Sequence, residues 1–271
     1  MSSRRDDFGD RMKDYERRET DRHLLPLIPI YARVDGRSFS KFTHGMERPY
    51  DLRLSECMIQ TTEWLVAEAN ANLGYTQSDE ISLVWYQPDP TSQTFFNGKL
   101  SKLHSVLAAM TTAKFTSLAV KHWPDRVAKL LPHFDARIIN LPTLIETANM
   151  ILWRERDATR NSIEMAGRHY YSSKQLFKKN CRVIQEMLFE KGVNWNNYPA
   201  FFKRGTFVQK RRVVKELDAT VLSKIPEKHR PVGPIERWEI VRLDMPSFAT
   251  VTNRVEVIFD GADPVVLTKD K

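Results

Sequence analysis

The stretch GYTQSDEISLVWY, from Gly74 to Tyr86, has two short apolar and aromatic segments on either side of a polar Gln-Ser-Asp-Glu turn. Two such segments joined by a tight polar turn are typical of a β-hairpin. Asp79 and Glu80 are therefore expected at the tip of the hairpin, where the chain reverses.

The segments on both sides of this hairpin extend the pattern. A β-rich run over 28–34 ends in Asp-Gly and predicts a buried strand. Apolar residues at three- to four-residue spacing predict amphipathic helices over 52–73 and about 99–122, and another strand is expected over 132–142. This order is that of an α+β, ferredoxin-like βαββαβ sheet. Both helices would cover one face and leave the opposite face free for substrates.

The rest of the chain divides at Pro142. Residues 1–142 would form the catalytic core, with the polar first 22 residues as an arm or a helix that docks on it. Residues 143–271 are first helical and then alternate apolar with polar residues, which predicts helices followed by added strands. We expect this second part to pack on the core, bind RNA and form oligomer contacts.

Composition excludes several classes of protein. The 271 residues carry 42 Lys and Arg against 34 Asp and Glu, a net charge of +8, which favours a polyanionic partner. No run of 18 apolar residues exists and the first residues are polar, so we expect a cytoplasmic protein without a membrane span. The two cysteines, Cys57 and Cys181, lack the spacing of a zinc ribbon, a redox pair or a disulfide scaffold.

Three carboxylates are candidates for metal chemistry. Asp35 ends the first strand, which in a ferredoxin-like sheet lies beside the hairpin tip with Asp79 and Glu80. Carboxylate oxygens suit Mg²⁺, and two such ions can stabilise the attacking and leaving oxygens of phosphoryl transfer. Each motif alone is also a common solvated turn, so the pairing of the two carries the prediction. The string DGRSFSKF from Asp35 adds backbone amides, hydroxyls and cations that suit a triphosphate.

These two strings, DGRSFSKF and GYTQSDEISLVW, resemble the signature pair of the tRNA-His guanylyltransferase family, which extends RNA in the 3′-to-5′ direction. Further matching strings are RPYD at Arg48, WRERDATRNS at Trp153 and NRVEVIFDG at Asn253. The resemblance implies a polymerase-type palm, ATP and GTP as substrates, tRNA as partner, and a homotetramer built as a dimer of dimers.

The resemblance also implies roles for individual residues. Two Mg²⁺ ions would be held by Asp35, Gly36 and Asp79, with Glu80 as a third matching acid. Nucleotide contacts would come from Asp35, Gly36, Arg37, Ser38, Phe39, Ser40, Ser78 and Asp79, and further triphosphate or RNA 5′-end contacts from Arg48, Lys99 and Lys102.

One segment departs from part of the family. Eukaryotic members carry a His-Ile-Asn-Asn-Leu-Tyr-Asn string where this chain has residues 159–165, Thr-Arg-Asn-Ser-Ile-Glu-Met. The chain therefore resembles the Thg-like branch, whose members repair 5′-truncated tRNAs against a template base. The alternative is a strict tRNA-His guanylyltransferase that adds a single G.

A basic run, Lys203, Arg204, Lys210 and Arg211, is interleaved with aromatic residues on a segment expected to be strand-like. It would follow the phosphate backbone of an acceptor stem, or it is simply a solvated face. Two rival functions remain: a palm-fold nucleotide cyclase, which would need a cyclase string in place of QSDEIS, and a non-catalytic RNA-binding protein, whose RNP-type string is missing.

Overall fold

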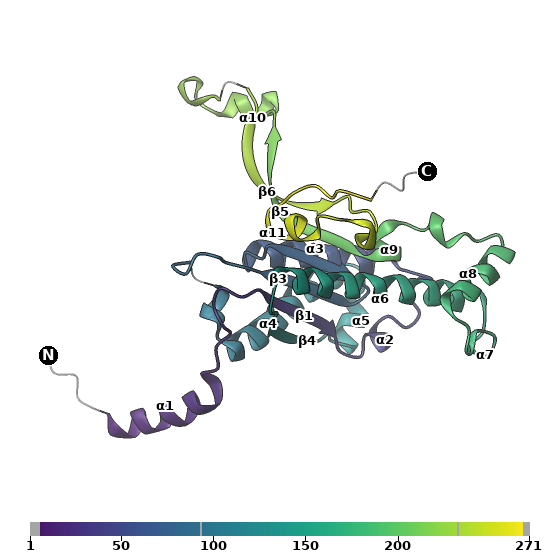
Figure 1. Ribbon diagram of the computed structural model, residues 1–271, viewed down its shortest axis with the longest axis horizontal. Coiled ribbons are helices and arrows are strands. Elements are labelled where there is room, and N and C mark those ends of the chain that lie inside the picture. The colour runs from purple at the N-terminus through teal and green to yellow at the C-terminus, as the bar shows by residue number, and fades with distance from the viewer. Residues whose placement is uncertain (1–5, 93, 232, 268–271) are drawn as a thin grey trace.

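A single antiparallel sheet organises the molecule, and its strand order is β4-β1-β3-β2-β5-β6 (Figure 1). The computed structural model describes residues 6–92, 94–231 and 233–267. The strands are β1 (Ile30–Gly36), β2 (Leu73–Gln77), β3 (Glu80–Trp85), β4 (Phe134–Asn140), β5 (Thr206–Lys215) and β6 (Ile235–Leu243). The first four give the predicted βαββαβ order, so the ferredoxin-like α+β fold is confirmed.

Two long helices cover one face of the sheet, as the apolar spacing predicted. They are α3 (Leu52–Glu68) and α4 (Leu100–Ala119), and their buried stripes pack against the inward side chains of β1 and β3. Fully buried Leu65 and Leu107 lie in this layer. Burying a side chain of this size contributes about 1.5–3 kcal/mol to stability, so this layer holds the strands that carry the candidate carboxylates.

The opposite face is covered as well, which corrects the expectation of a free face. Helix α6 (Leu144–Tyr170) crosses it, and Ile151 and Leu152 pack there with Tyr75 of β2 and Phe207 of β5. The segment after β6, including α11 (Arg254–Phe259), closes the same layer (Figure 1). The end of the sheet near Asp35 opens into a pocket on this face.

The remaining helices are short or peripheral. Helices α7 (Ser173–Leu176), α8 (Cys181–Glu190) and α9 (Ala200–Arg204) gather near the C-terminal end of α6, while α2 (Phe39–Phe42) and α5 (Pro124–Lys129) flank the core. Short 3₁₀ turns cover Phe95–Gly98, Trp195–Asn197, Glu227–His229 and Phe248–Thr250. Within the described residues, no helix combines the length and apolar content needed to cross a membrane.

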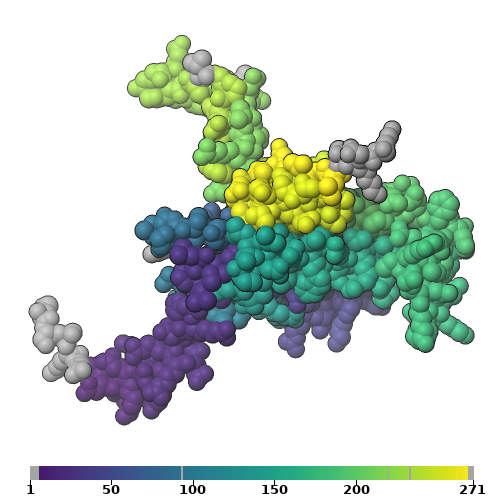
Figure 2. Space-filling model, viewed as in Figure 1, coloured from purple at the N-terminus to yellow at the C-terminus, as the bar shows by residue number. Residues whose placement is uncertain are grey.

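Two elements project from the body (Figures 1 and 2). Helix α1 (Asp7–Thr20) has no buried residue, so it fits the first of the two expectations for the N-terminal segment, an arm, and not a docked helix. The outer part of the β5–β6 hairpin extends away from the body and carries α10 (Ala219–Lys224) near its tip. Because β5 pairs with β2, residues after Pro142 extend the same sheet as the core.

Candidate active site

The end of β1 and the tip of the β2–β3 hairpin are joined by a direct hydrogen bond. The backbone N–H of Gly36 donates to the carbonyl of Asp79 over 3.0 Å. The antiparallel register also places Asp35 opposite Glu80. Two motifs far apart in the sequence therefore meet at one point of the sheet.

Asp35, Asp79 and Glu80 line one pocket at this point, with about 590 Å³ of empty space including its open mouth. We call it the acidic pocket; its lining is Arg33, Asp35, Gln77, Ser78, Asp79, Glu80, Arg137, Arg154, Asp157 and Asn161. The structure thus brings the three predicted carboxylates together.

Asp35 and Asp79 carry negative charge that no cation among the described residues pairs with directly. Burial raises the pKa of the Asp79 carboxyl to about 6; the neighbouring Asp35 carboxylate adds to the rise, and a hydrogen bond from the Ser78 hydroxyl opposes it. Burial and the facing Asp135 carboxylate likewise raise the pKa of Asp35, and the positive charges of Arg137, Arg33 and Arg154 offset part of this rise. In the described part of the chain neither aspartate forms an ion pair, so both favour the approach of a cation.

Glu80 is in the opposite situation. Both of its carboxylate oxygens accept hydrogen bonds from the Arg154 guanidinium of α6, at 2.7 and 2.5 Å. The same guanidinium donates to Asp157 at 3.0 Å, and both Glu80 and Arg154 are about 5% exposed. Both oxygens of the Glu80 carboxylate are engaged by this bidentate ion pair. Glu80 therefore holds the Arg154 guanidinium in position at the wall of the acidic pocket.

The Asp-Gly turn depends on a close approach that only glycine allows. A Cβ on Gly36 would lie 2.3 Å from the Phe39 ring. That ring is buried against Phe42, Phe115 and Phe134 with centroids 5.0–5.4 Å apart. Phe39 therefore anchors the turn in the core, so a nucleotide contact at this position would come from its backbone. Arg37, Ser38 and Ser40 are exposed on the loop beside it.

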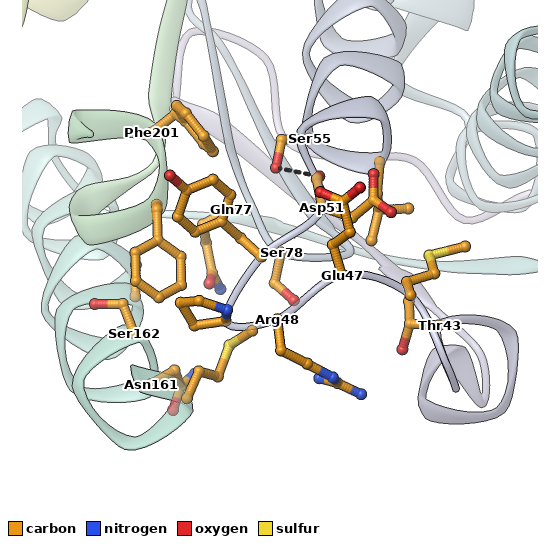
Figure 3. A pocket seen from close by; sticks show the side chains of 17 residues that line it. Thr43, Glu47, Arg48, Asp51, Ser55, Gln77, Ser78, Asn161, Ser162 and Phe201 are labelled. Carbon is orange, nitrogen blue, oxygen red and sulfur yellow. Dashed lines mark hydrogen bonds between the residues drawn. The ribbon is translucent and has the colours of Figure 1, made fainter. Parts of the chain in front are cut away.

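A second, more apolar cavity adjoins the acidic pocket and shares Gln77, Ser78 and Asn161 with it (Figure 3). It holds about 700 Å³ of empty space including its open mouth. Its lining, here called the apolar cavity, is Thr43, Met46, Glu47, Arg48, Pro49, Tyr50, Asp51, Leu54, Ser55, Gln77, Ser78, Ala158, Asn161, Ser162, Met165, Phe201 and Phe202.

The walls of the apolar cavity suit a nucleobase beside a polyphosphate. The Tyr50 ring packs on Phe201 and Phe202, with centroids 5.2 and 4.8 Å apart, and offers an aromatic wall. Asp51 caps α3 and is bound by Arg53, while Arg48 is exposed and lines the cavity. Aromatic and apolar walls that also carry polar groups are typical of ligand pockets, and the charged phosphates would extend toward Ser78 and the acidic pocket.

The acidic pocket also fits a divalent cation. Its two unpaired carboxylates are hard oxygen ligands, which Mg²⁺ prefers. The described residues contain no group of three or more His, Cys, Asp or Glu side chains that could hold a metal alone. A cation bound to Asp35 and Asp79 would thus take further ligands from water, backbone or substrate phosphates, as Mg²⁺ commonly does.

Comparisons with known proteins agree with this geometry. The family model described as tRNAHis guanylyltransferase matches residues 9–142. The tRNA(His) guanylyltransferase of Schizosaccharomyces pombe is 31% identical over 212 residues, covering 72% of this chain and 77% of the relative. The chain belongs to the tRNA-His guanylyltransferase family. It is accordingly a nucleotidyltransferase.

Solved structures of the family share the whole architecture. A bacterial tRNA(His) guanylyltransferase-like protein in complex with ATP superposes with a TM-score of 0.77 at 32% identity, covering 93% of this chain and 98% of that one. A bacterial protein of the same description in complex with GTP gives 0.70 at 30% identity, covering 90% and 94%. The palm-type fold is therefore shared over nearly the full length.

Two of the nucleotide positions expected from the family likeness lie elsewhere. Lys99 precedes α4 and its ammonium contacts Asp21 at 3.2 Å. Phe115, sixteen residues further along α4, packs beside Phe39 at the Asp35 end of the sheet. At 1.5 Å per residue that separation is about 24 Å, so Lys99 and Lys102 do not line the pocket of their own chain.

The basic run does not form one surface, and part of it is not strand. Lys203 and Arg204 end helix α9, and Arg204 lies 4.0 Å from the buried carboxylate of Glu155. Arg211 forms an ion pair with Asp263 at 2.6 Å, so it is engaged within the chain. Lys210 instead lies over the exposed Trp238 ring of the projecting hairpin. The four basic residues thus lie in different surroundings and do not form one continuous basic surface.

Several site residues were not expected from the sequence. Arg154, Asp157 and Asn161 of α6 line the acidic pocket, and Phe201 and Phe202 line the apolar cavity. The string from Trp153 already placed an arginine and an aspartate three positions apart on one helix face, which was the available signal. Nothing in the local sequence indicated that this face would reach Glu80.

Proposed function

We propose that this protein adds nucleotides to the 5′ end of tRNA in the 3′-to-5′ direction, as a template-dependent repair enzyme of the Thg-like branch. One observation carries the proposal: the Gly36–Asp79 hydrogen bond holds Asp35 and Asp79 in one pocket that adjoins an apolar cavity suited to a nucleobase. Nucleotide and metal would therefore meet at one place, as phosphoryl transfer requires.

The residues present support a division of labour. Asp35, Asp79 and the Gly36 carbonyl would hold two Mg²⁺ ions, which polarise the nucleophile and neutralise the leaving group when bound. The base of ATP or GTP would lie against Tyr50 and Phe202, with Arg48 and the Ser78 hydroxyl near the phosphates. The RNA 5′-phosphate would first be adenylylated with release of pyrophosphate; the 3′-hydroxyl of the incoming nucleotide would then displace AMP.

The branch assignment rests on helix α6. Residues 159–165 differ from the eukaryotic string, and Asn161, Ser162 and Met165 of this segment line the apolar cavity. Because these residues differ from the eukaryotic ones at the nucleotide pocket, they support a difference in which tRNA 5′ ends the enzyme accepts. We therefore favour repair of several truncated tRNAs over strict addition of one G to tRNA-His.

The test is incorporation of labelled nucleotide into RNA. The full chain, Mg²⁺ and labelled ATP or GTP are incubated with a set of tRNAs lacking their first nucleotide and, in parallel, with full-length tRNA-His. Templated addition across the truncated set supports the proposal, and addition to tRNA-His alone supports the strict enzyme. Label in a free cyclic product would support a cyclase, and no label in any product would overturn the proposal.

We further propose that the protein assembles as a tetramer and that the projecting hairpin contributes to RNA contacts through Lys210. Val214 and Trp238 on the hairpin are 63% and 58% exposed, and apolar surface of this kind supports an assembly contact. Light scattering of the purified chain tests the assembly. A mass of one chain over a wide concentration range would contradict it.

A further inference from the structure

The acidic pocket has two flanks in the sheet, and only one of them adjoins the apolar cavity. Gln77 and Ser78 at the end of β2 belong to both cavities. On the other flank β1 and β4 carry Arg33 and Arg137, which are partners across the two strands and line the acidic pocket. In the strand order β4-β1-β3-β2, the β4 flank lies beside β1, which carries Asp35, and the β2 flank lies beside β3, which carries Glu80.

The β1–β4 flank carries cations that the fold does not neutralise fully. Arg33 is partly buried and forms no ion pair within the described residues. The nearest acid to Arg137 is Asp135, whose carboxylate is 3.7 Å away with both side chains more than half exposed. Such a pair is weak in water. Both guanidiniums are therefore available to a phosphate that reaches the pocket.

An exposed indole adjoins Arg33 on this flank. Trp153 of α6 is 52% exposed, and the guanidinium carbons of Arg33 and Arg154 lie 5.8 and 4.5 Å from its ring centroid. The Arg154 guanidinium is fixed by its two hydrogen bonds to Glu80. The ring is thus packed on a rigid support. A single exposed aromatic needs no explanation by itself, but an aromatic among arginines beside a phosphoryl-transfer pocket matches the chemistry that binds nucleic-acid ends.

We propose that Trp153, Arg33 and Arg137 form a docking platform for the 5′-terminal nucleotides of the RNA substrate. The indole stacks on the terminal base, and the arginines contact the backbone phosphates next to it. The inference rests on the proposed function. The nucleobase of the incoming nucleotide would occupy the apolar cavity on the β2 flank. The RNA must bring its 5′-phosphate to Asp35 and Asp79, so it would lie on the β1–β4 flank.

Substitution of Trp153 tests the platform. The substrate is a truncated tRNA that carries a 5′-triphosphate and 2-aminopurine as its terminal base. Stacking on the indole quenches the fluorescence of this base, so the wild-type protein should quench it on binding. We expect Trp153→Ala to abolish the quenching and to lower kcat/KM for RNA about tenfold, the usual scale of one lost base stack. The KM for the nucleotide should not change, because the apolar cavity is untouched.

Matched variants separate stacking from a general effect. Trp153→Phe keeps an aromatic ring and should retain most of the quenching. Phe189→Ala removes an aromatic side chain that is 71% exposed on α8 and should behave as the wild type. Arg137→Gln, at an exposed position, should lower the slope of log K against log salt by about 0.7–0.9, the value of one phosphate contact.

The outcomes distinguish this inference from the proposed function. Wild-type addition of nucleotides supports the proposed function whatever the variants do. Equal quenching and equal kcat/KM for the wild type and Trp153→Ala would overturn the platform while leaving that function intact. If no nucleotide were added to any tRNA, the proposed function would fail, and the quenching series would still decide whether Trp153 stacks on the RNA end. Melting midpoints verify that each variant is folded.

Discussion

Asp79 and Glu80 are neighbours in the sequence, yet the fold treats their charges in opposite ways. Glu80 is the first residue of β3 and is locked to Arg154 of α6 by two hydrogen bonds. Asp79 lies in the turn before it, with Asp35 as its neighbour and no cation of the described chain paired to it. The first arrangement holds the structure together, and the second is costly until a cation arrives. A carboxylate left uncompensated beside a compensated one points to the place where chemistry occurs.

The largest effect should follow from removing the uncompensated pair. Asp35→Asn or Asp79→Asn keeps the side-chain shape but removes a charged metal ligand. Charge stabilisation by bound metal contributes several kcal/mol to such transition states, so we expect nucleotide addition to fall by about 10³-fold or more. The rate of label incorporation into truncated tRNA measures this.

Asp135→Asn is the matched control for the metal pair. Asp135 faces Asp35 across the β1–β4 ladder, but its side chain is exposed and does not line the acidic pocket. It should keep most of the wild-type activity. Equal loss in this variant and in Asp35→Asn would mean that overall negative charge, and not metal ligation, is what the activity needs.

Breaking the ion pair between Glu80 and Arg154 should lower the stability of the protein. Arg154→Met leaves the Glu80 carboxylate buried at 5% exposure without its counter-charge. Breaking a buried ion pair from one side costs about 3 kcal/mol or more. The urea midpoint at pH 7 should therefore drop well below that of the wild type, and Glu80→Gln added to Arg154→Met should restore part of the loss.

Arg160→Met is the control for this pair. Arg160 also forms an ion pair with Asp157 on α6, but its side chain is 61% exposed. Exposed pairs contribute about 0–1 kcal/mol, so this variant should unfold near the wild-type midpoint. If both arginine variants lost the same stability, burial would not be the cause.

The sequence predicted the parts of the fold that depend on local periodicity. Strand and helix spacing indicated the βαββαβ order, and in that order Asp35 lies beside the hairpin tip, as the register of β1 and β3 confirms. The sequence did not predict Arg154 as the partner of Glu80, because the two are 74 positions apart and α6 was expected to lie outside the palm. Long-range pairing of this kind depends on how a helix crosses a sheet, which no local pattern encodes.

Two expected nucleotide positions show what residue type alone does not decide. Phe39 lies among the polar residues of the expected nucleotide loop, but Phe39 and Phe42 are three apart and share one buried side of a short helix. Lys99 and Lys102 match nucleotide positions by likeness to the family, while the length of α4 carries them to the far end of the sheet. Residue type indicated suitable chemistry in both cases, and only the packing decided the location.

The smallest effect we expect concerns the stability cost of the uncompensated pair itself. The pKa of Asp79 is raised from 3.8 to about 6. Between these two pH values, Asp79 is protonated in the folded protein and ionised in the unfolded chain. Its contribution to stability is complete below pH 3.8 and is lost as pH rises through about 6. At pH 7 without metal, the free energy of unfolding of Asp79→Asn should therefore exceed that of the wild type by about 2 kcal/mol, after allowance for solvent screening.

At pH 5 in EDTA this gap should shrink, because the wild type is then largely protonated at Asp79. Added Mg²⁺ should stabilise the wild type more than the variant, since a ligand that binds only the folded state raises stability by mass action. Urea unfolding at both pH values, with Asp135→Asn in parallel, provides the measurement. A variant no more stable than the wild type at pH 7 would show that Asp79 is already compensated without metal, and the contrast with Glu80 would not hold.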